Sequence, residues 1–142
     1  MRNEELLIRL TQTQGIAGYE KKVRELIEQE VRPYADELIV DPLGSLIAVK
    51  KGKGGPHSKK IMFAAHMDEI GFMVKKIEED GRLLVCNVGW NWTASAYNTR
   101  VVFRNGIYGV VSSMKNIEDA HNDPNALFIA VSYTHLRAHE TS

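Results

Sequence analysis

The chain of 142 residues has one cysteine, four prolines and no net charge. Its only cysteine, Cys86, cannot form an internal disulfide, which is typical of cytosolic proteins. Because 18 basic residues balance 18 acidic ones, no positive excess exists to bind nucleic acid or an anionic membrane. No apolar run approaches the ~18–20 residues of a membrane helix, and the N-terminus has no apolar signal core. We therefore expect a cytoplasmic protein with no nucleic-acid and no membrane partner.

The composition is that of a globular protein, with 44% hydrophobic and 25% charged residues. Apolar residues at helical spacing predict one helix around residues 6–10 and a second over about 19–32, which Pro33 ends. Two short, apolar, β-branched runs, 37–41 and 45–50, flank a Pro-Leu-Gly turn and predict a hairpin. The first third therefore contains both helical and β-structure.

Residues 60–65 (Lys-Ile-Met-Phe-Ala-Ala) form a continuous apolar run. Such a run is typical of a strand buried on both faces of a mixed sheet. After it the chain is nearly all β, and the predicted strands cover 72–77, 83–88, 100–104, 107–113 and 127–131. This shift in composition predicts a small barrel-like module attached to, or inserted in, an α/β unit.

The most informative residues are His66 and Asp68, at the carboxyl end of the predicted buried strand. Ligands of α/β sheets bind at this end of the strands. Residues two apart on an extended chain point to the same side, so the carboxylate can orient the imidazole and raise the basicity of its other nitrogen. Histidines that bind metals commonly have such a partner. Taken alone, the H-x-D pattern favours a simple hydrogen bond without a metal, because so short a pattern often arises by chance.

Three separated stretches carry a more specific resemblance. They are residues 15–20 (Gly-Ile-Ala-Gly-Tyr-Glu), 40–48 (Val-Asp-Pro-Leu-Gly-Ser-Leu-Ile-Ala) and 65–71 (Ala-His-Met-Asp-Glu-Ile-Gly). In this order they resemble the dinuclear-metal aminopeptidases of metallopeptidase family M forty-two. That family includes glutamyl and deblocking aminopeptidases, and many relatives are labelled endoglucanase.

The resemblance implies an aminopeptidase-like α/β sandwich with a β-rich, barrel-like insert, here truncated. Residues 1–71 would be the N-terminal part of the catalytic domain and residues 72–131 an incomplete dimerisation-type insert. Peptides would be the substrates, and dimers would build a dodecamer. His66 matches a zinc or cobalt ligand of a site with two divalent metal ions, and Asp68 matches the catalytic carboxylate that orients it. The other ligands and the general base lie further along the family's chains, so we expect this fragment to be inactive alone.

Two other functions compete with this hypothesis. One is a non-catalytic β-rich assembly or binding module beside a vestigial metal pocket. The other is a glycan hydrolase, whose two acids must face each other across a sugar. Asp68 and Glu69 are adjacent, and on an extended strand they point to opposite faces, which disfavours the glycan alternative.

Several further features carry less weight. Residues 132–142 have neither periodicity nor turn chemistry, and we interpret them as a non-native tail. His135 and His139, within that tail, are therefore rejected as metal ligands. The polar cluster at 118–123 is interpreted as a solvated connection. Trp90 and Trp92 would form either a contact patch or partly buried loop anchors.

Overall fold

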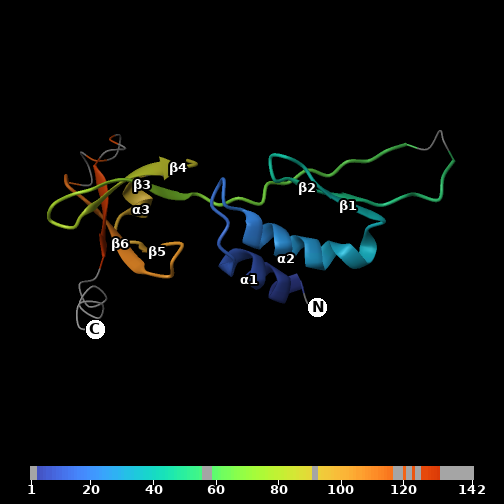
Figure 1. Ribbon diagram of the computed structural model, residues 1–142, viewed down its shortest axis with the longest axis horizontal. Helices are drawn as coiled ribbons and strands as arrows, with labels where there is room; N and C mark the ends of the chain where they lie inside the picture. Colours follow the sequence, from blue (N-terminus) through green and yellow to red (C-terminus); the bar gives the residue numbers. More distant parts are fainter. Residues whose placement is uncertain are drawn as a thin grey trace. The chain divides into compact units, whose positions relative to one another are not determined.

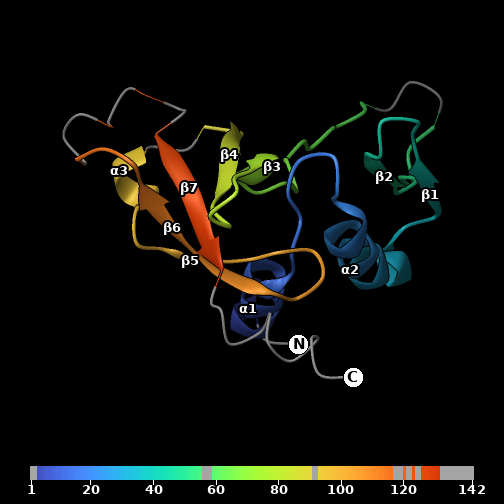
Figure 2. The same ribbon diagram turned by 60° about the vertical axis from the view of Figure 1, so that its left-hand side comes forward.

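The computed structural model describes residues 3–55, 59–90, 93–116, 120, 123 and 126–131 (Figures 1 and 2). The chain divides into two compact units, Met1–Glu69 and Ile70–Ser142.

The first unit begins with two helices, α1 (Asn3–Gln12) and α2 (Lys21–Val31). They are joined by an ion pair in which Arg9 Nη1 lies 2.6 Å from Glu30 Oε1. The apolar stripe of α2 places Val23 in the interior, where its side chain is 4% exposed. Both predicted helices are therefore confirmed.

Helix α2 passes directly into a short 3-10 helix, η1 (Arg32–Tyr34), which contains Pro33. Proline cannot donate a backbone hydrogen bond to continue an α-helix, so α2 ends where the sequence predicts. The chain then enters the antiparallel hairpin of β1 (Glu37–Val40) and β2 (Leu46–Val49), which is also confirmed.

The turn of this hairpin is organised by Asp41. Its Oδ1 atom accepts backbone N–H groups from Leu43 at 3.0 Å and Ser45 at 2.8 Å. The hydrogen bond from the Ser45 amide is the main reason that the pKa of Asp41 lies below its usual value. Gly44 adopts φ +95°, a conformation that glycine reaches without steric cost.

The predicted buried strand at 60–65 is absent. Residues 59–68 belong to no helix or strand, and Figure 1 shows them as a plain extended trace between β2 and β3. Ile61, Met62 and Phe63 are 79%, 88% and 94% exposed. An apolar run becomes a sheet strand only where a neighbour pairs with its backbone, and the described residues provide no such neighbour.

The second unit is a five-stranded antiparallel sheet with the order β3-β4-β7-β6-β5. Its strands are β3 (Gly71–Ile77), β4 (Leu83–Val88), β5 (Arg100–Val102), β6 (Tyr108–Ser113) and β7 (Leu127–Val131). All five predicted strands are therefore confirmed. A short helix, α3 (Thr93–Ala96), was not predicted. Barrel-like closure is not confirmed, because this strand order leaves β3 and β5 at the two edges of the sheet.

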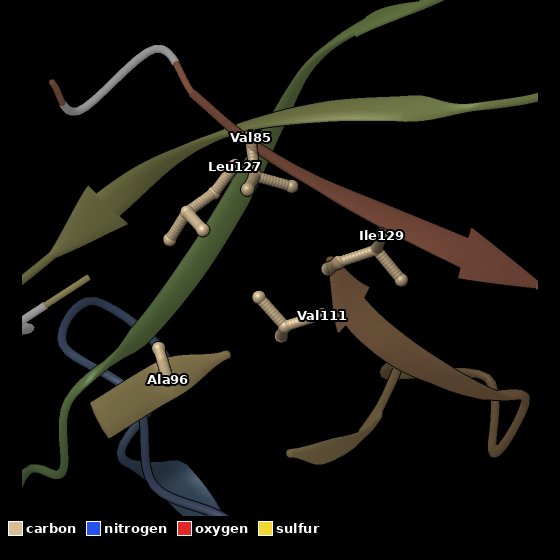
Figure 3. Close-up of a cluster of buried hydrophobic side chains, with 5 residues drawn as sticks. All are labelled: Val85, Ala96, Val111, Leu127 and Ile129. Carbon is tan, nitrogen blue, oxygen red and sulfur yellow. The ribbon is translucent and has the colours of Figure 1, made fainter. Parts of the chain in front are cut away.

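One face of the sheet carries the hydrophobic core of this unit. Figure 3 shows its buried side chains, which are Val85, Ala96, Val111, Leu127 and Ile129. Gly109 lies beside this core, where a Cβ atom would collide with the Ile129 side chain. The described helices are all too short and polar to cross a bilayer.

Candidate functional site

The candidate site lies on the segment that leads out of the first unit, and this segment is fixed to the loop between α1 and α2. The Glu69 amide donates to the Gly15 carbonyl at 2.8 Å. The Gly15 amide in turn donates to Glu69 Oε1 at 2.9 Å. Ile16 and Glu69 form an isolated parallel β-bridge. The end of the segment therefore has a defined position, although residues 59–68 form no strand.

His66 and Asp68 are in direct contact, as their spacing predicts. His66 Nδ1 lies 3.0 Å from Asp68 Oδ1 and 3.0 Å from the Asp68 backbone oxygen. Both partners are acceptors, so this network assigns the ring proton to Nδ1 and leaves the lone pair on Nε2. The His66 side chain is 85% exposed and that of Asp68 is 41% exposed. This is the tautomer that can bind a metal ion through Nε2.

The neighbouring carboxylates have different partners. Asp68 contacts His66, whereas the Glu69 carboxylate contacts Gly15, as expected for adjacent residues on an extended chain. The two acids therefore do not face each other as a glycosidase pair would.

The donor set for a metal is incomplete in the part of the chain that the structure describes. No group of three or more His, Cys, Asp or Glu side chains suited to one ion occurs there. A catalytic zinc site uses three protein ligands and keeps one position open. His66 fits the role of one such ligand, with Asp68 as the group that orients it. The remaining ligands would have to come from other residues.

Sequence reasoning missed the pairing of Gly15 with Glu69. Both residues lie in stretches already singled out, 15–20 and 65–71, so a signal was available. Their separation of 54 positions gives no geometric information, however, and only the fold brings them together.

Among the other residues singled out from the sequence, those that the structure describes form no metal site. Trp90 is 83% exposed, so it is no buried anchor, while Trp92 lies outside the described residues. In the polar cluster, Asp123 accepts from Lys115 Nζ at 2.7 Å. The cluster's other acidic and histidine residues, Glu118, Asp119 and His121, and the tail at 132–142 also lie outside the described residues.

The chain resembles known proteins in sequence and in structure. A protein of Acetivibrio thermocellus is 46% identical over 118 residues, which are 83% of this chain and 34% of that protein. The TET aminopeptidase of the Thaumarchaeota archaeon SCGC AB-539-E09 superposes with a TM-score of 0.77 at 30% identity, over 91% of this chain and 38% of that one. The Pyrococcus horikoshii TET1 peptidase is described as assembling into a tetrahedron or a large octahedral shell. It superposes with a TM-score of 0.68 at 31% identity, over 91% of this chain and 40% of that one.

The chain thus spans about a third of the length of the first of these relatives. Residues 44–129 match the model of the M42 glutamyl aminopeptidase family. This match includes strand β2, the His66–Asp68 pair and most of the five-stranded sheet. The chain therefore belongs to the M42 glutamyl aminopeptidase family.

Proposed function

We propose that this chain is part of a metal-dependent aminopeptidase, which releases N-terminal residues from peptides. His66 would bind one of two divalent ions, zinc or cobalt, through Nε2. The observation that carries the proposal is the contact between His66 Nδ1 and Asp68 Oδ1, which presents Nε2 as an acceptor. Residues 1–71 would contribute to the catalytic domain. The single cysteine residue supports a cytoplasmic location.

The chain's own residues have a limited part in the chemistry. Asp68 fixes the ring orientation and keeps the proton on Nδ1, so that Nε2 carries the lone pair. When bound, the metal pair would activate a water molecule and polarise the scissile carbonyl. The described residues hold no group of three or more His, Cys, Asp or Glu side chains suited to one ion, and we expect the 142-residue chain to be inactive by itself.

We also propose that residues 72–131 form a homo-oligomer contact. Tyr108 and Val110 alternate with the buried residues of β6, so they lie on the face of the sheet opposite the core. They are 50% and 43% exposed, and Val102 on the neighbouring β5 is 40% exposed. An antiparallel sheet with one face in water normally has polar residues on that face. Dimers that build a dodecamer would cover this apolar surface; the similar Pyrococcus horikoshii peptidase, described as assembling into a tetrahedron or a large octahedral shell, supports a homo-oligomer.

A second candidate is a non-catalytic assembly or binding module with a vestigial metal pocket. Two observations favour it: the exposed apolar face of the sheet, and a metal donor set limited to His66 in the described residues. Such a protein would form oligomers without hydrolysing peptides.

Peptidase assays separate the two candidates. The complete polypeptide that carries these residues would be loaded with zinc or cobalt and assayed on aminoacyl-p-nitroanilides. We expect a metal-dependent release that His66→Ala abolishes and Lys60→Ala leaves unchanged, because Lys60 is an exposed residue of the same segment. Oligomers without metal-dependent release would support the second candidate instead.

A further inference from the structure

We infer that Glu69 is a positioning residue for the His66–Asp68 pair. This inference rests on the proposed function, in which that pair contributes to a metal site. Glu69 follows Asp68 directly and makes two hydrogen bonds to one residue, Gly15. Its amide donates to the Gly15 carbonyl at 2.8 Å, and its Oε1 accepts from the Gly15 amide at 2.9 Å.

Two bonds to one residue fix more than a single bond would. The bond from the Glu69 amide and the Ile16–Glu69 bridge align the backbone of the segment with the loop. The side-chain bond closes a ring between Gly15 and Glu69 and restrains the backbone at Glu69 further. The loop then sets the orientation of the backbone at Glu69. Through that backbone it also sets the orientation of Asp68, the residue before it.

The loop is a suitable anchor because it is itself well supported. The Tyr19 amide donates to the Ile16 carbonyl at 2.8 Å, and the Gly18 amide donates to Glu20 Oε1 at 2.7 Å. Gly15 lies against the buried Val23 of α2, and a Cβ atom at Gly15 would be 2.7 Å from Val23 Cγ1. The anchor residue is therefore packed on α2 at a distance that only glycine allows.

The His66–Asp68 pair depends on such an anchor. Residues 59–68 have no strand partner in the described part of the chain, so no sheet holds the segment N-terminal to the pair. His66 is 85% exposed and is therefore not held by packing. The two bonds at Glu69 act one residue after the pair and restrain it from that side.

Glu69 could instead act through its charge, as a metal ligand or base, and its geometry argues against this. Its Oε1 atom is directed at the Gly15 amide, while Asp68, on the other side of the chain, meets the imidazole. A positioning role requires an acceptor oxygen of the right reach. A ligand or base requires the negative charge.

Two conservative variants separate these roles in the 142-residue chain. Glu69→Gln keeps the acceptor and the reach but loses the charge, and Glu69→Asp keeps the charge but is one methylene too short. The readouts, by NMR, are amide exchange at Gly15 and the ring nitrogen shifts of His66, which report the tautomer. We expect Glu69→Gln to match the wild type. In Glu69→Asp, Gly15 exchange should rise about fivefold to tenfold, and the His66 proton should redistribute between the two nitrogens.

The opposite pattern would overturn the inference. If Glu69→Asp matches the wild type and Glu69→Gln does not, the charge is what matters. If Gly15 exchange rises while the His66 ring is unchanged, Glu69 is merely structural. Should Glu69→Asp fail to fold, Glu69→Ala removes the side-chain acceptor, keeps the backbone bond to Gly15, and must alter the His66 ring equally. None of these measurements requires a metal, so a lack of peptidase activity in the metal-loaded complete polypeptide would contradict the proposed function and leave this inference standing.

Discussion

His66 directs Nδ1 at Asp68, with 3.0 Å separating the ring nitrogen from both the carboxylate and the backbone oxygen of that residue. The same aspartate therefore supplies two acceptors to one N–H group. The pair selects a tautomer with its lone pair on Nε2, which is the nitrogen then free to bind a metal.

Removing the carboxylate should weaken metal binding in the complete polypeptide. Partners that orient a metal-binding histidine typically contribute a factor of about 10–100 in affinity, and we expect a loss in this range for Asp68→Ala. Asp68→Asn keeps an acceptor oxygen and should lose less. Competition with a chromogenic chelator measures both affinities. Wild-type affinity in Asp68→Ala would contradict the orienting role.

The exposed apolar segment gives a sharp contrast between the structure and the sequence-based prediction. Phe63 is 94% exposed, so Phe63→Ser should change the free energy of unfolding of this chain by less than about 0.5 kcal/mol. In a buried strand, truncating a phenylalanine typically costs about 3–5 kcal/mol. Urea denaturation followed by circular dichroism distinguishes the two values.

Leu127→Ala is the matched control for this comparison. Leu127 is fully buried, and its truncation should cost about 2–5 kcal/mol. If Phe63→Ser were as destabilising as Leu127→Ala, the exposed conformation described for residues 59–68 would be wrong.

Close packing at Gly109 predicts a second loss of stability. A Cβ atom there would collide with Ile129 and lie 3.3 Å from a ring carbon of Phe103. Overpacking of this kind typically costs about 1–3 kcal/mol, so Gly109→Ala should lower the melting temperature. Gly55→Ala serves as the control, because its Cβ would meet no atom within 4 Å. Equal melting temperatures for the two variants would contradict the packing described for β6 and β7.

The hairpin turn should respond to acid. The pKa of Asp41 is lowered from 3.8, chiefly by the hydrogen bond from the Ser45 amide, so its ionised form is favoured in the folded hairpin. The pKa of Asp36 is lowered as well, chiefly by the hydrogen bond from the Lys51 amide. This stabilisation is fully present above about pH 3.8 and is lost as the pH falls through the lower pKa values of the folded hairpin.

NMR shifts of the Ser45 amide would follow this transition directly. In Asp41→Asn the side chain cannot titrate, so the Ser45 shift should become nearly independent of pH in this range. A wild-type Ser45 amide that does not respond to acid would contradict the turn geometry.

Local pattern was enough to predict most elements of this fold. Pro33 marks the end of α2, and the Pro-Leu-Gly turn marks the first hairpin. Each signal acts within a few residues, so no knowledge of the tertiary structure is needed.

Features that depend on distant partners were harder to predict. The apolar run at 60–65 has the composition of a buried strand, but a strand also needs neighbours, which composition does not report. By contrast, the spacing of His66 and Asp68 predicts their contact, because both lie on one short segment. The pairing of Gly15 with Glu69 spans 54 positions and emerges only from the fold.

Metal binding through Nε2 of His66 can be seen directly by anomalous diffraction at the zinc absorption edge, from crystals of the complete polypeptide loaded with zinc. We expect an anomalous peak about 2.0–2.1 Å from Nε2 of His66, with Asp68 still on Nδ1. Zinc bound at other residues, with the His66 ring uncoordinated, would contradict it.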